Sequence, residues 1–409
     1  MKGSKRLNVF IKFDGDEILV GQLILDNRLV HFKYDEDFLA LGLNLSPFKL
    51  KYNTDIQVAL PDPFRGIFGV FDDSLPDGWG MLLLNRALAK KGLSLNDINI
   101  LDQLAYIGDT GKGALIYRPA YEAEGSFNDL IDIDNLKTAI DQVYYGTSTS
   151  VIEELLSLGG SSGGARPKAN VGYHKETNEL IHGQHILPEG FEHWIIKFPS
   201  SEDPRDIANI EYAYHQMALS ANIPMSECKL LESEQAMQVF ATKRFDRIGN
   251  DRVHMHSLAG LRHDNYRLSS MDYGHIIDTA YELERTAVAR EQVLRLAAFN
   301  IYSHNRDDHS KNFSWLMDQN GTWRMSPAYD LTYSSTGIDE HITRVAGEGA
   351  NPGRSHLIEL ARHFSINKPN EIIDQVQEAL SHWPRIASEW RVSKTSTKRI
   401  EAKLNELRD

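Results

Sequence analysis

The first third of the chain alternates hydrophobic and polar residues in the way typical of β-strands joined by tight turns. Residues 9–13 alternate in this way, and an Asp-Gly pair follows them. Two further extended runs, 18–25 and 29–32, are separated by an Asp-Asn pair. Period-two alternation broken by such pairs indicates hairpins. We therefore expect the first ~120 residues to form mainly strands and turns.

Helical spacing of hydrophobic residues becomes dominant later in the chain. An early segment, 81–90, has helical composition, and a glycine-rich turn within 107–117 leads into a strand. Beyond residue 207 the pattern predicts helices at 207–220 and 287–302, with several more near the C-terminus. The pattern as a whole predicts an α+β protein with a β-rich N-terminal region and a mostly helical C-terminal region.

A change of composition near residue 148 marks the expected domain boundary. Residues 120–150 are polar and acidic and end in Gly-Thr-Ser-Thr-Ser. A chain of 409 residues is long enough for two domains. We predict domains at 1–148 and 149–409.

Composition narrows the classes of protein. A hydrophobic fraction of 41% provides a core, and no run approaches the ~20 apolar residues that a membrane helix needs. The basic start lacks the apolar segment of a signal peptide, and Cys228 is the single cysteine, so we expect a cytoplasmic protein without contact to a membrane. A net charge of −13 argues against nucleic-acid binding by this chain alone.

Candidate chemistry begins with the glycine-rich segment 159–168, Gly-Gly-Ser-Ser-Gly-Gly-Ala-Arg-Pro-Lys. Glycines allow backbone N–H groups to approach phosphate oxygens, and Lys168 adds positive charge. The spacing is not that of a Walker loop, and a flexible linker has a similar composition.

Lys197 lies in the otherwise apolar run Trp-Ile-Ile-Lys-Phe-Pro. Burying a lysine is costly unless it meets an anion. Kinases place such a lysine on a strand to bind ATP phosphates, and a helix glutamate holds it. Glu211, in the predicted helix that follows, is the candidate partner. The alternative is a lysine at a sheet edge that extends to solvent.

The segment 304–313 contains Arg-Asp-x-x-x-x-Asn, the spacing of a kinase catalytic loop. Asp307 would accept the proton of a substrate hydroxyl, and Asn312 would offer an amide oxygen to Mg²⁺. Lys311 would neutralise charge on the transferred phosphoryl group. Asp308 is a rival to Asp307, and only the spacing to Asn312 distinguishes them.

Asp330 follows at the position where kinases hold a second magnesium ligand, although a turn residue would fit equally well. The order of glycine loop, strand lysine, helix glutamate, Asp/Asn loop and aspartate is more specific than any one segment. Together they predict transfer of a phosphoryl group from Mg·ATP.

These segments resemble the serial motifs of HipA-like serine/threonine kinases. The resemblance also covers the N-terminal part, at 72–78 and 104–115. The motifs that carry it are Ser161–Lys168, Ile195–Pro199, Lys243–Arg247, Asn305–Asn312 and Tyr329–Asp330.

The resemblance implies a small β-rich N-terminal domain packed on a mostly α-helical, atypical protein-kinase-like domain. It also implies a toxin that a HipB-like antitoxin neutralises, with operator DNA bound mainly through the antitoxin. The implied substrate class is aminoacyl-tRNA synthetases, the glutamyl type above all, whose phosphorylation stops translation.

The resemblance also implies roles for individual residues. Ser161 would be the autophosphorylation site, with Ser162 as a neighbouring candidate, and Asp307 and Lys311 would be catalytic. Asn312 and Asp330 would hold magnesium. The implied ATP-binding residues are Gly163, Gly164, Ala165, Arg166, Pro167, Lys168, Lys197, Lys243, Arg244, Phe245, His309, Ser310, Lys311, Asn312, Tyr329 and Asp330.

Two departures from the family pattern and two other functions bear on these expectations. The glycine loop reads Gly-Gly-Ala-Arg-Pro where many members have Ala-Gly-Ala-Gln-Glu, and 256–260 replaces an acidic stretch, which affects substrate identity. A kinase of lipids or small molecules is one alternative. A catalytically silent co-repressor scaffold is the other.

Overall fold

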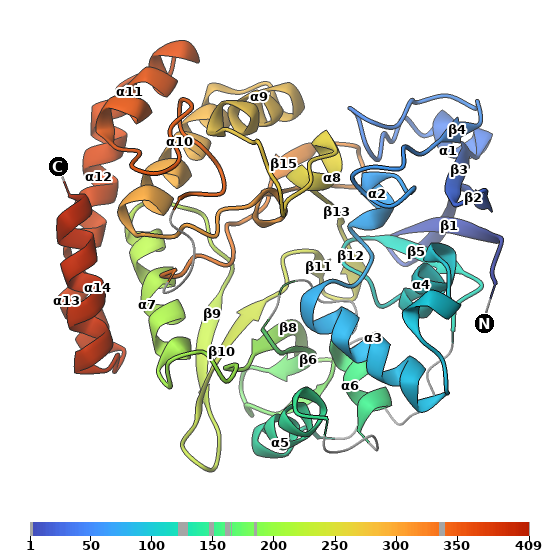
Figure 1. Cartoon of the computed structure of the whole chain (residues 1–409), viewed down its shortest axis with the longest axis horizontal. Helices are drawn as coiled ribbons and strands as arrows, with labels where there is room; N and C mark the ends of the chain where they lie inside the picture. The colour runs from blue at the N-terminus through green and yellow to red at the C-terminus, as the bar shows by residue number, and fades with distance from the viewer. Residues whose placement is uncertain are drawn as a thin grey trace.

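The computed structural model describes residues 3–121, 130–146, 151–159, 164, 166–183, 186–334 and 340–408. Its two largest sheets have five antiparallel strands each. Figure 1 shows the first sheet in blue and cyan near the N-terminus and the second sheet in green. A group of helices in orange and red forms the C-terminal end. The predicted α+β class is therefore confirmed.

The N-terminal sheet has the strand order β4-β3-β2-β1-β5. The predicted alternation holds, because every second residue of β1 from Leu7 to Phe13 is buried and the intervening ones are not. The strands are β1 (Arg6–Phe13), β2 (Asp16–Asp26), β3 (Leu29–Tyr34), β4 (Gln57–Val58) and β5 (Leu115–Arg118).

The same region contains more helix than the alternation predicted. The helix expected at 81–90 begins three residues earlier, and the helix at 100–107 had no counterpart among the predicted elements. Asn99 caps the latter by accepting hydrogen bonds from the backbone of Leu101 and Asp102. The helices are α1 (Glu36–Ala40), α2 (Gly69–Asp72), α3 (Gly78–Lys90), η1 (Leu95–Asp97) and α4 (Ile100–Ile107).

The second sheet has the order β7-β6-β8-β10-β9 and is accompanied by three helices. The predicted helix 207–220 is confirmed as α7. The elements are α5 (Ile133–Tyr144), α6 (Ile152–Gly159), β6 (Lys168–His174), β7 (Leu180–His182), β8 (Phe191–Lys197), α7 (Ile207–Ser220), β9 (Cys228–Glu232) and β10 (Gln238–Lys243).

The remaining chain is largely helical and includes α10 at the predicted residues 287–302. None of the helices in the described part of the chain combines the length and apolar character needed to cross a membrane. The elements are β11 (Arg247–Ile248), β12 (Asp251–Arg252), β13 (His254–Ser257), α8 (Leu258–Arg262), α9 (Tyr273–Glu284), α10 (Ala287–Tyr302), η2 (Ser310–Asn312), β14 (Ser314–Met317), β15 (Trp323–Met325), α11 (Arg354–His363), α12 (Pro369–Ser381), α13 (Trp383–Glu389) and α14 (Lys394–Leu407).

The two largest hydrophobic cores of the described residues both combine residues from distant parts of the chain. The larger core contains Phe32 of the first sheet together with Tyr214 of α7 and Trp383 of α13. The second core joins Trp79 and Leu83 of α3 to buried residues of α5, α6, β6, β8 and β10. Figure 1 shows α3 beside α6, so a helix from the N-terminal third covers the second sheet.

A buried charge cluster also connects the two regions. Asp246 accepts hydrogen bonds from Arg244, from Arg247 and from the backbone of Gly113. Arg247 in turn donates to the carbonyl of Gly111 at 2.9 Å. Burial alone would raise the pKa of Asp246, but the two guanidinium groups hold it well below its usual range. The glycine turn before β5 is thereby attached to the loop after β10.

We predict that Asp246→Ala lowers the free energy of unfolding by about 3–5 kcal/mol, because it leaves two buried guanidinium groups without their carboxylate. Differential scanning calorimetry should show a lower Tm. Glu389→Gln is the control, since Glu389 forms an exposed pair with Arg385 and its loss should cost less than about 1 kcal/mol. Equal Tm values for the two variants would contradict a structural role for the cluster.

Candidate active site

Lys197 lies at the end of β8, and its ammonium group contacts two carboxylates. It donates to Glu211 of α7 and to Asp330, which follows β15. Its side chain is 11% exposed, and the ammonium nitrogen lies 5.4 Å from the centre of the Phe240 ring. Burial would lower the pKa of Lys197, but Asp330 and Glu211 raise it above its usual value. Three elements therefore meet at one charged group.

The contact between Lys197 and Glu211 agrees with the pairing predicted from sequence, and the contact with Asp330 was not foreseen. Asp330 has a φ of 55°, in the left-handed region that non-glycine residues seldom adopt. Burial would raise its pKa, but Lys197 and Lys168 hold it well below its usual range. Asp330 is therefore a carboxylate at neutral pH, the form that a magnesium ligand requires.

Lys168 lies directly opposite Lys197 in the pairing of β6 with β8. Opposite residues of an antiparallel pair are on the same face of the sheet. Lys168 is buried, and burial lowers its pKa. Its ammonium nitrogen would lie 2.8 Å from a Cβ added to Gly164, which has a φ of 85°. Two ammonium groups beside a glycine backbone form a surface suited to phosphate.

The catalytic-loop segment distinguishes two neighbouring aspartates that sequence alone left as rivals. Asp308 is 1% exposed and accepts hydrogen bonds from Tyr273, His341 and the backbone of Thr343, each at 3.1 Å. Asp307 is on the surface of the loop, with 57% of its side chain exposed. The geometry therefore favours Asp307 as the residue that can meet a substrate.

Charged groups of both signs surround Asp307. The neighbouring protein displaces water and, with the charges of Asp330 and Asp308, raises the pKa of Asp307, although His309 opposes this shift. The His309 ring nitrogen Nε2 lies 3.8 Å from the Asp307 carboxylate. Asp307 is thus more basic than an ordinary surface aspartate, which suits a group that accepts a proton from a hydroxyl.

Asn312 is oriented by a bond within its own loop. Its Nδ2 donates to the carbonyl of Asp307 at 2.8 Å. Because that partner is an acceptor, the amide nitrogen must be the atom that faces it, and the amide oxygen faces elsewhere. The side chain is therefore arranged with its oxygen available as a ligand for a hard cation.

Tyr329 contacts the end of the segment that contains Lys311 and Asn312. Its hydroxyl donates to the carbonyl of Lys311 at 2.7 Å and lies 2.6 Å from the hydroxyl of Ser314. Its ring packs against Phe245 with the two ring centres 5.5 Å apart. Ser310 is fully buried and donates to Asp264. These contacts fix the backbone on both sides of Lys311.

Three neighbouring residues that the resemblance assigns to ATP binding, Lys243, Arg244 and Phe245, have different surroundings. Lys243 donates to Glu192 at 2.6 Å and is partly exposed. Arg244 is buried in the cluster with Asp246, so its side chain contributes to that cluster and not to an open site. Phe245 faces Tyr329 and thereby approaches the loop of Lys311.

The glycine-rich loop is described only in part. Ser161, Ser162, Gly163 and Ala165 lie outside the described residues. Arg166 binds Asp203 at 2.9 Å and lies 3.6 Å from Glu211, so it shares a carboxylate with Lys197. The carbonyl of Pro167 accepts a hydrogen bond from the backbone of Phe198 at 2.8 Å.

Two acidic residues of the N-terminal region reach the site, and sequence reasoning gave them no role. The Lys311 ammonium group lies 3.1 Å from Asp77 and 3.6 Å from Asp72. The segment that contains them had been noted only for its family resemblance. The available signal was the run Asp-Asp-Ser-Leu-Pro-Asp, in which Asp72 is the first residue and Asp77 the last. Nothing in this run indicated which residue the two carboxylates would contact.

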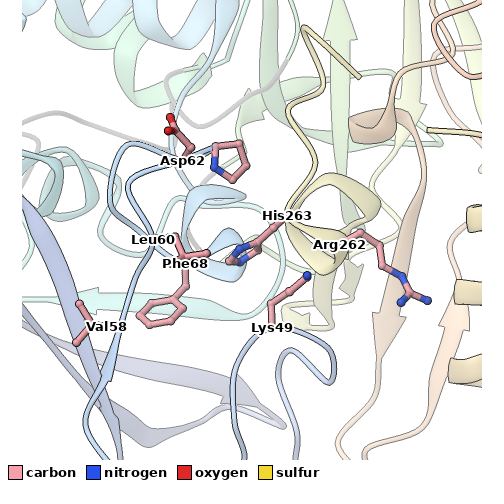
Figure 2. Close-up of a pocket in the computed structure, with 8 residues that line it drawn as sticks. Lys49, Val58, Leu60, Asp62, Phe68, Arg262 and His263 are labelled. Carbon is pink, nitrogen blue, oxygen red and sulfur yellow. The ribbon is translucent and has the colours of Figure 1, made fainter. Parts of the chain in front are cut away.

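A surface cavity of about 310 Å³ lies away from these residues (Figure 2). Figure 2 shows the Arg262 side chain extending away from the other lining residues, and its guanidinium group is bound to Thr279 and Glu282. The cavity contains none of the predicted site residues. It is lined by Lys49, Val58, Leu60, Asp62, Pro63, Phe68, Arg262 and His263.

The residues of the site fit a nucleotide that brings its own magnesium. Within the described ranges, no group of three or more His, Cys, Asp or Glu side chains could hold a metal ion by itself. Magnesium is commonly bound by one or two protein oxygens together with substrate phosphates. Asn312 and Asp330 could supply such oxygens, and Lys168 and Lys197 could supply charge for the phosphates.

A strand lysine held by a helix glutamate, followed by an Asp/Asn loop and a further aspartate, defines a protein with a kinase-like fold. Family models agree with this class. The HipA-like C-terminal domain matches residues 160–383, and the HipA N-terminal domain matches residues 11–118. The chain therefore belongs to the HipA-like family.

Known relatives are distant in sequence. The chain is similar in fold to a structure from Shewanella oneidensis MR-1, the toxin–antitoxin complex of HipA, HipB and operator DNA. The TM-score is 0.71 at 16% identity, covering 98% of this chain and 95% of that one. It is also 29% identical over 158 residues to the Sinorhizobium fredii protein Y4dM, a match of 34% of this chain. The chain thus spans only about a third of the length of that relative, because the match covers 36% of it.

We predict stability effects of very different size for the two adjacent aspartates. Asp308→Ala should lower the free energy of unfolding by roughly 3 kcal/mol, because it leaves three buried donors without an acceptor. Asp307→Ala should change it by no more than about 0.5 kcal/mol, because its carboxylate is exposed. Thermal unfolding of both variants measures this, and a larger loss for Asp307→Ala would show that the roles are reversed.

Proposed function

We propose that this chain is a protein kinase that transfers the γ-phosphoryl group of Mg·ATP to a serine or threonine hydroxyl. The observation that carries the proposal is the buried ammonium group of Lys197 between Glu211 and Asp330. In kinases, a strand lysine held by a helix glutamate and lying near the metal-binding aspartate is the group that binds ATP phosphates.

Each residue has a defined task in this mechanism. Lys197 and Lys168 bind phosphate oxygens, and Glu211 keeps Lys197 oriented. Asp307 orients the attacking hydroxyl and takes its proton as the new O–P bond forms. Asn312 and Asp330 would hold the magnesium that accompanies ATP, and this ion would supply charge neutralisation.

A toxin role is the second part of the proposal. The Shewanella protein that shares the fold forms a complex with HipB and operator DNA. By analogy, we propose that a small HipB-like antitoxin binds this chain and contributes the contact with DNA. The net charge of −13 supports this division, since the chain itself carries excess negative charge.

The substrate and the self-modification rest on family resemblance. We propose an aminoacyl-tRNA synthetase, of the glutamyl type first, as the substrate. We propose Ser161 as the autophosphorylation site. A phosphate there would bring about −2 charge next to the backbone of the loop that contains Gly164, which would oppose ATP binding.

We predict that Lys197→Ala and Asp307→Gln each reduce phosphoryl transfer from radiolabelled ATP, per folded protein, at least about hundredfold, because each removes a group that acts on the reacting complex. Lys229→Ala is the matched control, because this lysine lies on the same sheet but over the Tyr173 ring, outside the site. The protein's own label should map to Ser161 by phosphopeptide analysis.

The same assay distinguishes the alternatives. Label in the protein fraction of a cell lysate supports a protein kinase, whereas label in the lipid fraction would assign another substrate class. Complete absence of label with folded wild-type protein would favour the co-repressor scaffold and overturn the proposal.

We predict that expression of the wild-type chain arrests growth and that Lys197→Ala abolishes the arrest. Co-expression of a small helix-turn-helix protein from the adjacent reading frame should restore growth. Growth rate in inducible cultures measures both effects. Unimpaired growth despite active kinase in the cells would contradict the toxin role while leaving the enzymatic proposal intact.

A further inference from the structure

One carboxylate of the N-terminal region contacts two separate segments of the candidate site. Asp77 Oδ1 accepts a hydrogen bond from the backbone N–H of Gly164 at 2.6 Å. Asp77 Oδ2 accepts one from the Lys311 ammonium group at 3.1 Å. The phosphate-binding loop and the catalytic loop are therefore joined through a single side chain that belongs to neither.

Trp79, the second residue of α3, adds a second attachment to the loop that contains Gly164. The backbone N–H of Trp79 donates to the carbonyl of Gly164 at 2.9 Å. The indole N–H of Trp79 donates to the carbonyl of Lys168 at 3.1 Å, and the side chain is 1% exposed. Residues 77–79 thus bind the loop at both Gly164 and Lys168.

The position of α3 makes this attachment rigid. Trp79 belongs to the second hydrophobic core together with residues of α6 and β6. Gly159, at the end of α6, fits against the Trp79 indole so closely that an added Cβ would lie 2.9 Å from its nitrogen. A close-packed helix cannot shift without disturbing that core. Asp77 therefore presents its carboxylate from a fixed point.

The charges at this contact are complementary. Burial would raise the pKa of Asp77, but Lys112 and Lys311 lower it below the usual value. Burial would lower the pKa of Lys311, but Asp72 and Asp77 raise it. The contact therefore joins a carboxylate and an ammonium ion at neutral pH, and hydrogen bonds between charged groups are stronger than neutral ones.

We propose that Asp77 is a positioning residue that fixes the phosphate-binding loop and Lys311 relative to each other. The N-terminal region would then be a working part of the active site. The proposal rests on the proposed kinase function, through which Gly164 would meet ATP phosphates and Lys311 the transferred group.

The first arm of the test needs no activity. Hydrogen exchange of peptides containing Gly164 should be faster in full-length Asp77→Ala than in the wild type, because the loop loses its acceptor. Asp374→Asn, which removes an exposed helix carboxylate, should leave this exchange unchanged. Unaltered hydrogen exchange in Asp77→Ala would overturn the proposal, whether or not the wild type has kinase activity. Absence of kinase activity in the wild type would refute only the proposed function.

The second arm is steady-state kinetics of phosphoryl transfer per folded protein. Asp77→Ala should raise KM for ATP about tenfold or more, the scale of a lost charge-assisted hydrogen bond, and should also lower kcat through Lys311. Asp77→Asn should fall between it and the wild type, because its amide oxygen can still accept from Gly164. Asp374→Asn, which removes a carboxylate paired with Arg354 outside the site, should leave KM and kcat within about twofold.

Two kinetic results would overturn the proposal. A lower KM for ATP in Asp77→Ala would show that the carboxylate competes with phosphate for the loop. Unchanged kcat and KM together with a reduced Tm would show that Asp77 stabilises the fold and nothing more.

Discussion

Lys197 places an ammonium group where most water is excluded, and its charge is retained because Glu211 and Asp330 surround it. Each of the three comes from a different part of the chain: a strand end, a helix and the loop after β15. Removing Lys197 would leave the carboxylates of Glu211 and Asp330 without the cation between them, which destabilises the folded state. The fold around the site therefore depends on closing this triad, and the triad in turn holds Asp330 next to the catalytic loop.

The parts of the site that sequence predicted are those whose geometry is local or regular. Helix α7 follows β8 closely, so a lysine at the strand end and a glutamate one turn into the helix meet with little freedom. The spacing from Asp307 to Asn312 is likewise contained within one loop, whose internal hydrogen bond orients the amide. Such short-range relations follow from residue order alone, and the bounds of α7 and α10 agree with the predicted periodicity for the same reason.

The contacts that sequence could not predict join residues far apart in the chain. Asp77 meets Gly164 and Lys311, and the turn containing Gly113 meets Asp246, only because the whole molecule folds around them. Asp307 and Asp308 illustrate a different limit. The two aspartates are adjacent in the same loop sequence, and only their different burial in the folded protein separates their roles. Lys311 was assigned to the moving phosphoryl group, yet its partners here are carboxylates of the N-terminal region.

These carboxylates also explain how the site remains stable before a nucleotide arrives. Lys311 is neutralised by Asp72 and Asp77, and Lys197 by Glu211 and Asp330, so neither ammonium group requires phosphate in order to be buried. The same pairing limits how tightly phosphate can bind, because each lysine must share its charge between an internal carboxylate and the ligand. Under the proposed function, Asp330 would also hold magnesium. Its contact with Lys197 would then weaken and the charge of the lysine would become available to the phosphates, whereas Glu211 would keep the side chain in place. Binding of metal and of triphosphate would then favour each other through a shared carboxylate, with no movement of the backbone required.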